Sequence, residues 1–424
     1  MRQLFWGSAL FIAYVYVGYP VLLMLWARAA RLAAPGRQRA TADLQVSDPR
    51  DSGLPSVSII LAVRNEARRL PARIENLLAL DYPEDSTQII VVSDGSRDNP
   101  ASSLGRFGDR VRLVEVPPAG KAVALNAGAA CASGDILAFA DARQTFAPDA
   151  LRRLVAPLAD PEVGGVSGEL ILGAEAAAGR RNGAPRRVTN DDEWLDHDRR
   201  VTDRRLASTV DDGVGFYWKY EKLLRRLETE VGSMLGATGA IYALRRSLWR
   251  PLPAGTILDD VLAPMSAVLA GRRIVFEPAA RAFDYTSPDA VAESRRKIRT
   301  LAGNVQILWF EPRLLVPILN PVWLQYASHK VGRLLVPYAL MALFASSIAL
   351  SGTSLLYAFA LFAQVAFYLQ GGYGAWLEHR AQGAAPQERS LLQRMGGVAF
   401  TIVVMNVSAV AGAGAALFGR KVWR

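Results

Sequence analysis

Several short apolar runs of this sequence end in a polar side chain, and Asp141 closes one of them, the run 136–140. In a parallel sheet that is buried on both faces, strands read as continuous apolar runs and ligands bind beyond their carboxyl ends. Asp141 therefore stands where a bound phosphate, with or without a metal ion, would be handled. Arg143 follows two residues later, where a second carboxylate would complete a metal-binding pair.

A second candidate for chemistry is the adjacent pair Asp259 and Asp260, which opens a predicted helix. Carboxylates in a first turn meet the positive end of the helix dipole, which is a sufficient structural explanation. The functional interpretation is that one of them acts as a general base within hydrogen-bond reach of an acceptor hydroxyl. A neighbouring like charge and partial burial would raise its pKa into the range that suits a base.

Three more positions place polar groups after predicted strands or loops: Asn65-Glu66, Asp94 before Gly95, and Lys121 after a Pro-Pro-Ala-Gly sequence. Each has a structural alternative, because Asp and Asn cap helices and lysine is usually a solvated surface residue. Their joint placement at the ends of predicted strands favours a shared binding crevice.

The elements that would position these residues alternate between strand and helix. The predicted strands are 57–63, 88–93, 111–116 and 136–140, and the helices between them are 66–80, 97–107 and 119–132. Alternation at this spacing predicts a doubly wound α/β layer with a mostly parallel sheet.

A second half follows residue 161. The stretch 162–172 predicts a strand pair or a strand and a turn, and 173–213 is dense in charges of alternating sign, as in a flexible insertion. A helix with Leu223, Leu224, Leu227 and Val231 on its apolar face comes next. The small residues of 234–240 would let the backbone approach a ligand closely.

Composition indicates a membrane protein. Of 424 residues, 51% are hydrophobic and 21% charged, and the runs 4–26, 334–350, 354–369 and 398–418 contain no charge. Arginines directly follow the first run, which predicts a retained anchor with the following chain in the cytosol. Four spans would place the basic C-terminal tail outside, against the positive-inside rule. The segment 314–323, broken by two prolines, predicts an interfacial helix.

The remaining composition narrows the partners. The net charge of +10 fits a cytosolic face beside anionic lipid. The sequence contains no basic stripe interleaved with aromatic residues, so we do not expect it to bind nucleic acid. One cysteine excludes an intramolecular disulfide, and three widely spaced histidines argue against a histidine metal site. Four cations within 293–299 could pair with lipid phosphate or with a pyrophosphate leaving group.

The motifs resemble those of membrane-anchored family 2 glycosyltransferases with a GT-A domain, the group that contains cellulose, hyaluronan and poly-N-acetylglucosamine synthases. The resemblance covers 56–306 and rests on an Asn-Glu pair, an Asp-Gly-Ser sequence and a Gly-Lys-x-x-Ala-Leu-Asn motif. Here these stand at Asn65-Glu66, Asp94-Gly95-Ser96 and 120–126.

The resemblance implies a role for each matched residue. Nucleotide-sugar binding falls to Asn65, Glu66, Asp94, Lys121 and Asp141. Asp141 would also hold a divalent metal, Mg²⁺ or Mn²⁺, although Arg143 replaces the second motif aspartate and could itself share the charge. Asp260 would be the catalytic base of an inverting transfer.

Two further residues match motifs in part. Asp259 takes the glutamate position of a Thr-Glu-Asp motif, and Arg299 matches the arginine of Gln-x-x-Arg-Trp, near acceptor or pyrophosphate. The glutamine and tryptophan of that motif are absent, which favours transfer of a single sugar over chain elongation.

The predicted organisation is an anchor (1–30), a linker (31–55), a cytosolic GT-A domain (56–306), an interfacial region (307–330) and a membrane domain of about three spans (331–424). We expect a multi-pass protein of the inner (plasma) membrane that moves sugar from a nucleotide diphosphate sugar to a polysaccharide or glycolipid hydroxyl, with export or assembly proteins as further partners. Transfer to a lipid phosphate is one alternative. A non-catalytic scaffold subunit of a polysaccharide assembly complex is another.

Overall fold

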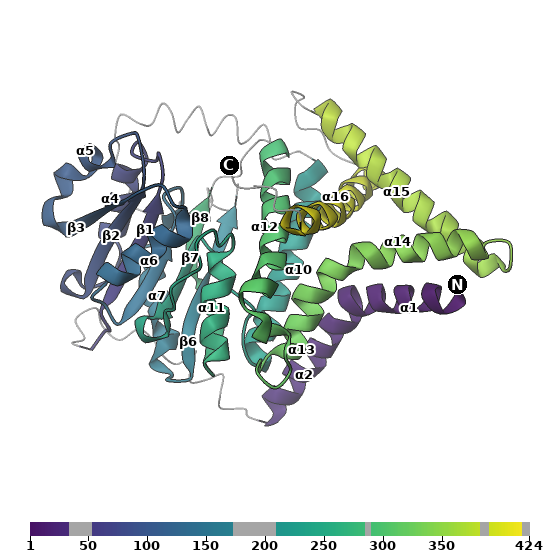
Figure 1. Ribbon diagram of the computed structural model, residues 1–424, viewed down its shortest axis with the longest axis horizontal. Helices are drawn as coiled ribbons and strands as arrows, with labels where there is room; N and C mark the ends of the chain where they lie inside the picture. The colour runs from purple at the N-terminus through teal and green to yellow at the C-terminus, as the bar shows by residue number, and fades with distance from the viewer. Residues whose placement is uncertain (34–52, 173–208, 285–289, 382–389, 418–424) are drawn as a thin grey trace.

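The computed structural model describes residues 1–33, 53–172, 209–284, 290–381 and 390–417. An α/β region forms one side of the molecule and long apolar helices form the other, with α10 (Thr209–Val231) and α12 (Ala290–Phe310) between them (Figure 1). Residues 34–52 of the predicted linker 31–55, and residues 173–208 of the predicted charged insertion, lie outside the described residues. The end of that insertion, residues 209–213, forms the start of α10.

The first half of the sheet has the predicted parallel strands. They are β1 (Val57–Val63), β2 (Thr87–Asp94), β3 (Val111–Val116) and β4 (Ile136–Ala140), in the order β3-β2-β1-β4. All five residues of β4 are buried, as expected for an apolar strand covered on both faces. The carboxyl ends of these strands therefore share one edge, which confirms the α/β expectation.

The second half makes the sheet mixed. Its strands are β5 (Thr145–Phe146), β6 (Val163–Leu172), β7 (Ile241–Arg245) and β8 (Arg273–Asp284), which extend the order by β7-β6-β8-β5. β7 runs antiparallel to both β4 and β6, whereas β6 and β8 are parallel. The segment 162–172 is a single strand rather than a pair.

Helices cover both faces of the sheet, because successive residues of β1 point to opposite sides. Ile59 packs in one core with α4 (Leu70–Leu78) and α7 (Ala150–Val155). Ile60 packs in the other with α6 (Lys121–Cys131) and α11 (Asp259–Leu269). Both cores are apolar. The core that contains Ile60 holds α6 and α11 on the same face of the sheet.

Two helices start later than their sequence pattern predicts. Asn65 adopts a φ of 56° and Asn99 a φ of 51°, which belong to left-handed backbone and interrupt a helix. Asn99 limits α5 to Pro100–Leu104, and its Oδ1 accepts from the backbone N–H of Ser102. α4 begins only at Leu70, because residues 67–69 form a turn in which the N–H of Ala67 donates to Oδ2 of Asp98.

Four helical stretches are long and apolar enough to cross a membrane: Arg2–Ala33, Trp323–Leu350, Leu355–Leu377 and Leu392–Ala415. The first comprises α1 (Arg2–Ala13), a π-helical turn and α2 (Tyr19–Ala33), and α1 packs along α14 (Gly332–Leu350). α15 (Leu355–Ala381) packs along α16 (Leu391–Leu417). This number of helices agrees with the four predicted spans.

α10 packs against the first long apolar helical stretch as well as against the α/β region. Its residues Leu224 and Leu227 pack against Tyr19 and Leu23 of α2. The predicted apolar face is wrong at Leu223, which is 41% exposed. Leu224, the next residue, points toward α2 and is buried, because it lies on the face of α10 that contacts α2.

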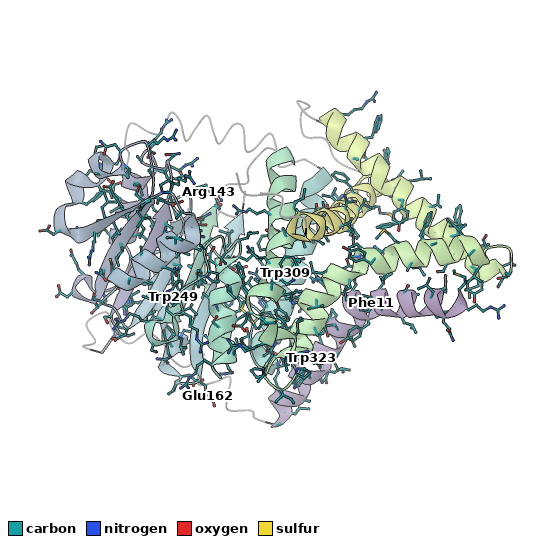
Figure 2. The ribbon with its side chains drawn as sticks, in the orientation of Figure 1. Phe11, Arg143, Glu162, Trp249, Trp309 and Trp323 are labelled. Carbon is teal, nitrogen blue, oxygen red and sulfur yellow. The ribbon has the colours of Figure 1, made fainter. Side chains whose placement is uncertain are left out.

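Trp309 on α12 and Trp323 on α13 (Trp323–Gln325) lie at the junction of the two regions (Figure 2). Between them, Leu315, Val316 and Ile318 are exposed, Ile318 to 94%. An exposed apolar segment beside the first residue of a long apolar helix suits the interface of a bilayer. The interfacial assignment of 307–330 stays a prediction.

Candidate active site

Asp94 ends β2 and organises the loop that leads into α6. Its carboxylate is buried and accepts hydrogen bonds from the backbone N–H groups of Ala119, at 2.7 Å, and Gly120, at 3.0 Å. These hydrogen bonds fix the backbone directly before Lys121, the first residue of α6, and so position its side chain. Arg64 adds a longer contact to Asp94, at 3.7 Å.

Lys121 connects three elements at the carboxyl edge of the sheet. Its Nζ lies 3.2 Å from Oδ1 of Asp141, after β4, and 3.3 Å from Oδ2 of Asp259, in the first turn of α11. Burial alone would lower the pKa of Lys121, but Asp259, Asp141 and Asp260 raise it above its ordinary value. The ammonium is therefore charged and holds the carboxylates together.

Asp260 lies directly beside this cluster and is half-buried. Burial raises its pKa to about 6, and the carboxylate of Asp259 adds to the effect, while Lys121 and Lys330 oppose it. Its backbone carbonyl accepts a hydrogen bond from the N–H of Ala237 at 2.6 Å. This carboxylate has the electrostatic environment of a general base.

The small residues of 234–240 were expected to let the backbone approach a ligand, and in the structure this stretch lies against Asp260. A Cβ atom on Gly239 would lie 2.8 Å from Oδ2 of Asp260, and Gly236 adopts a φ of 134°. A side chain at Gly239 would therefore displace the carboxylate of Asp260. Close backbone approach here serves the protein's own carboxylate.

Asn65 and Glu66 reach the same edge but point into local structure. Oδ1 of Asn65 accepts from the N–H of Arg97 at 2.9 Å, and its N–H donates to Oγ of Ser96 at 3.1 Å. Glu66 forms an ion pair with Arg69 at 2.7 Å. These contacts hold the loops after β1 and β2 together, so a role in nucleotide binding stays a prediction for both residues.

Arg143 does not contact Asp141 in the described part of the chain. Its guanidinium lies 3.6 Å from Oδ2 of Asp284, which also accepts from Nε2 of Gln144 at 2.7 Å. Arg299 lies exposed on α12, and among the described residues it makes no contact with the cluster around Lys121. Its proposed place near acceptor or pyrophosphate stays a prediction.

The donor set around Asp141 fits a metal ion held by one protein carboxylate. Among the described residues, no group of three His, Cys, Asp or Glu side chains could enclose a metal. Oδ1 of Asp141 faces Lys121, while its Oδ2 takes no hydrogen bond within the described ranges. Mg²⁺ and similar cations bind through one or two carboxylates when substrate phosphates complete the shell.

Two buried residues near Asp141 did not stand out in the sequence. Arg73 on α4 donates from Nε to the carbonyl of Asp141 at 3.1 Å, and burial lowers its pKa to about 9 although Asp141 opposes the shift. Tyr242 on β7 lies near Asp259, and burial raises its pKa well above the ordinary value. The sequence held one signal for Arg73: it lies between Leu70 and Ile74, on the apolar side of a predicted helix, where an arginine is unusual.

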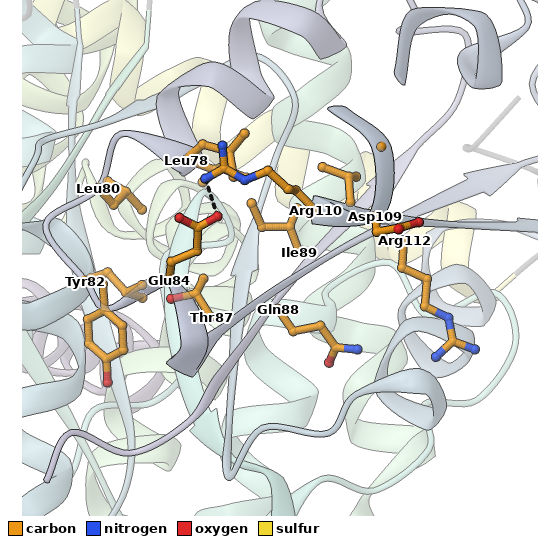
Figure 3. Close-up of a pocket in the computed structure, with 14 residues that line it drawn as sticks. Leu78, Leu80, Tyr82, Glu84, Thr87, Gln88, Ile89, Asp109, Arg110 and Arg112 are labelled. Atoms are coloured by element: carbon orange, nitrogen blue, oxygen red, sulfur yellow. Dashed lines mark ion pairs between the residues drawn. The ribbon is translucent and has the colours of Figure 1, made fainter. Parts of the chain in front are cut away.

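A cavity of about 520 Å³ lies at the other edge of the sheet (Figure 3). Thr87 and Val111, the first residues of β2 and β3, line it, and an ion pair of 2.7 Å joins Glu84 to Arg110 at its rim. Because Asp94 stands at the opposite end of β2, this cavity is separate from the cluster around Lys121.

Comparison with known proteins gives the family. The model of "Glycosyl transferase family 2" matches residues 58–227. An N-acetylglucosaminyltransferase of Rhizobium leguminosarum bv. trifolii is 34% identical over 128 residues, which are 28% of this chain and 70% of that protein. The chain belongs to glycosyl transferase family 2.

Other similarities extend this family assignment. The probable glycosyltransferase YdaM of Bacillus subtilis (strain 168) is 32% identical over 119 residues, which cover 26% of this family 2 chain and 28% of YdaM. The chain matches 27% to 35% of the length of the first curated relatives.

A solved structure confirms the GT-A-like fold. The mannosyltransferase PcManGT from Pyrobaculum calidifontis, in complex with GDP-Man and Mn²⁺, aligns with a TM-score of 0.59 at 21% identity. The alignment covers 95% of this family 2 chain and 98% of PcManGT, so the likeness includes the apolar helices.

Proposed function

We propose that this family 2 protein transfers a sugar from a nucleotide diphosphate sugar to a hydroxyl group of a polysaccharide or glycolipid acceptor. The observation that carries the proposal is the placement of Lys121 between Asp141 and Asp259, with Asp260 beside them, at the carboxyl edge of the sheet. Ligands of open α/β sheets bind at this edge. The complex of PcManGT with GDP-Man supports the donor class.

Lys121 is the residue that we assign to the diphosphate of the donor. Nζ now divides its charge between two carboxylates, and a bound diphosphate would replace one of them. Asp94 binds the backbone of the loop before Lys121 and would thereby hold the ammonium group at the carboxyl ends of the strands.

Asp141 is the residue that would hold a divalent cation. When bound, such a cation neutralises charge on the leaving diphosphate. Arg73 would hold Asp141 in place, because its guanidinium donates to the Asp141 carbonyl from α4, on one face of the sheet. The Mn²⁺ in the PcManGT complex supports the assignment of the metal class.

Asp260 is the residue that we assign as general base. It takes the proton of the acceptor hydroxyl as that oxygen forms a bond to the anomeric carbon of the donor. The bond from the anomeric carbon to the diphosphate oxygen breaks, and the nucleotide diphosphate leaves with the electron pair. Attack opposite the leaving group inverts the anomeric configuration.

We also propose that this reaction takes place beside a membrane, and the four long apolar helices support that proposal. We assign a multi-pass location in the inner (plasma) membrane, with the α/β region in the cytosol, because Arg28 and Arg31 follow the first apolar run. The growing polysaccharide or glycolipid would then meet the α/β region at the bilayer surface.

Purified full-length protein in detergent tests the proposal. Common nucleotide sugars are supplied with Mg²⁺ or Mn²⁺, and release of nucleoside diphosphate is measured with and without extracted membrane glycolipids. Release with at least one donor, stimulated by the extract, is expected. Absence of release and of binding for every donor would contradict the catalytic assignment and leave the scaffold alternative.

A further inference from the structure

A second group of charged residues lies where α10 meets the first membrane helices. It comprises residues on α10 and on the π-helix Tyr326–Val331 with its continuation into α14. We call it the junction cluster, and its members are Glu221, Arg225, Glu228, His329, Lys330 and Arg333. The α10 members recur every three or four residues and so share one face of that helix.

The carboxylates of the junction cluster already have partners. Glu228 accepts from the Tyr19 hydroxyl at 2.8 Å and from Nδ1 of His329 at 2.6 Å. Glu221 pairs with Arg333, and Nε2 of His329 lies 3.5 Å from it. Both acidic groups are buried and satisfied within the cluster.

Arg225 and Lys330 form no ion pair with a carboxylate among the described residues. Glu221 and Glu228 act on Lys330 from beyond ion-pair distance, and Glu221 acts on Arg225 in the same way. Arg225 donates from one Nη to Oγ1 of Thr238 at 2.7 Å and lies 5.8 Å from the Trp218 ring. Lys330 is half-buried and forms neither a hydrogen bond nor an ion pair within the part of the chain that the structure describes. A partly buried ammonium that has no hydrogen-bond acceptor of its own keeps donor capacity that a bound anion would satisfy.

These two cations lie toward Asp260. Thr238, which binds Arg225, precedes Gly239, and Gly239 abuts the Asp260 carboxylate. The charge of Lys330 acts on Asp260 directly. An anion held by Arg225 and Lys330 would therefore sit close to the position of an acceptor hydroxyl.

Lys330 lies near the start of a long apolar helical stretch. Lys330 follows Trp323, where the second apolar stretch begins, and the neighbouring segment exposes Leu315 and Ile318. An anion at this depth would belong to a molecule with one part in the headgroup layer and one part in the acyl layer.

We propose that Arg225 and Lys330 bind the phosphate of a lipid-linked sugar acceptor, so that a hydroxyl of its sugar reaches Asp260. The inference rests on the proposed function and names the acceptor class of that site. The lipid phosphate is a spectator: the sugar hydroxyl gives its proton to Asp260 and bonds to the donor carbon, and the nucleotide diphosphate leaves as before. Arg225 and Lys330 thus position the acceptor.

The test measures binding of dodecyl phosphate and of dodecanol to full-length protein in neutral detergent micelles, by isothermal titration calorimetry. We expect dodecyl phosphate to bind at least about tenfold more tightly, because each phosphate contact to a cation is a charge-assisted hydrogen bond. Lys330→Gln and Arg225→Gln should each weaken it roughly tenfold. Equal affinity for the phosphate and the alcohol would overturn the inference.

Matched variants separate charge from folding. Arg226→Gln removes an exposed arginine next to Arg225 on the same helix and should leave phosphate binding unchanged. Lys330→Arg keeps the charge and should retain binding. If Arg226→Gln weakens binding as much as Arg225→Gln, the effect is general surface charge and the assignment is wrong. Thermal melting shows which variants remain folded.

Two further ligands distinguish the source of the phosphate. Inorganic phosphate that binds as tightly as dodecyl phosphate would show an anion site without a lipid requirement, which overturns the inference. Phosphatidylglycerol that competes equally would indicate a bulk-lipid site and would also overturn it. Preference for dodecyl phosphate over both supports it.

Nucleotide-sugar binding in the same samples separates this inference from the proposed function. Donor binding in wild type without any preference for dodecyl phosphate overturns only the acceptor site. Loss of the phosphate preference in Lys330→Gln with donor binding intact supports a positioning role. If wild type binds no nucleotide sugar, the proposed function fails, and an acceptor site that rests on it fails as well.

Discussion

Nζ of Lys121 lies 3.3 Å from Oδ2 of Asp259, and this ion pair ties the start of α6 to the start of α11 across the carboxyl edge of the sheet. The two residues are 138 positions apart in the chain, since 259 minus 121 is 138. The pair holds Lys121, which we propose binds the donor diphosphate, next to the carboxylate that precedes the proposed base.

The rate of transfer should depend on the protonation of Asp260. Its pKa is raised to about 6, and a general base works only when deprotonated, so kcat/KM should fall as the pH drops through about 6. The fall should be about tenfold per pH unit below the pKa. A kcat/KM profile between pH 5 and pH 8 tests this, with donor binding measured at each pH. A profile that is flat down to pH 5 would contradict the assignment.

Asp260→Asn should abolish proton removal without disturbing the donor. We expect kcat to fall roughly a hundredfold to ten-thousandfold, the usual contribution of a general base. Donor affinity should stay within about twofold, because Lys121 keeps its contacts to Asp141 and Asp259. Steady-state kinetics and calorimetry measure both, with Asp109→Asn, exposed at the far edge of the sheet, as control. Loss of donor binding would reassign Asp260 to the donor site.

Lys121→Met should weaken binding of nucleoside diphosphate. Removal of the ammonium takes away a charge-assisted contact and leaves Asp141 and Asp259 uncompensated, so the affinity should fall roughly tenfold to a hundredfold. Titration calorimetry measures the change. Lys219→Met, an exposed lysine of α10, should bind nucleotide as wild type does. Unchanged affinity in Lys121→Met would place the diphosphate elsewhere.

The affinity for the divalent metal should rise with the number of carboxylates at the Asp141 site. Chelation should remove activity and Mn²⁺ should restore it, and Asp141→Asn should raise the Mn²⁺ concentration for half-maximal rate about tenfold or more. Arg143→Asp adds a carboxylate and should lower that concentration, whereas Arg143→Gln, which only removes the cation, serves as its control. Full activity after exhaustive chelation would argue that cations of the chain suffice.

Gly239→Ala should impair the chemical step through Asp260. The new methyl group would lie 2.8 Å from Oδ2, so the carboxylate must turn away from its position. We expect kcat to fall about tenfold or more while the melting temperature changes little, since a loss of geometry costs rate before stability. Gly105→Ala, where nothing lies within 4 Å of an added Cβ, is the control. Equal kcat values in both variants would contradict this role.

Much of the α/β region was predictable because its strands are continuous apolar runs. β1, β3 and β4 have the predicted bounds, and Asp94 and Asp141 stand at the ends of their strands. Helix starts were less predictable, because the left-handed backbone of Asn99 and the turn at 67–69 are features that apolar periodicity does not report. The antiparallel placement of β7 also depends on contacts between distant segments.

Sequence alone determined the residue types, the parallel strand ends that carry them and the four apolar helices, since these follow from local pattern and composition. Tertiary structure decided which charges form ion pairs. Lys121 pairs with Asp141 and Asp259, and Arg143 pairs with Asp284, whereas Arg225 and Lys330 form no ion pair among the described residues. The physical reason is that periodicity reports which face of an element is buried, whereas an ion pair depends on distances between elements that only the packed chain establishes.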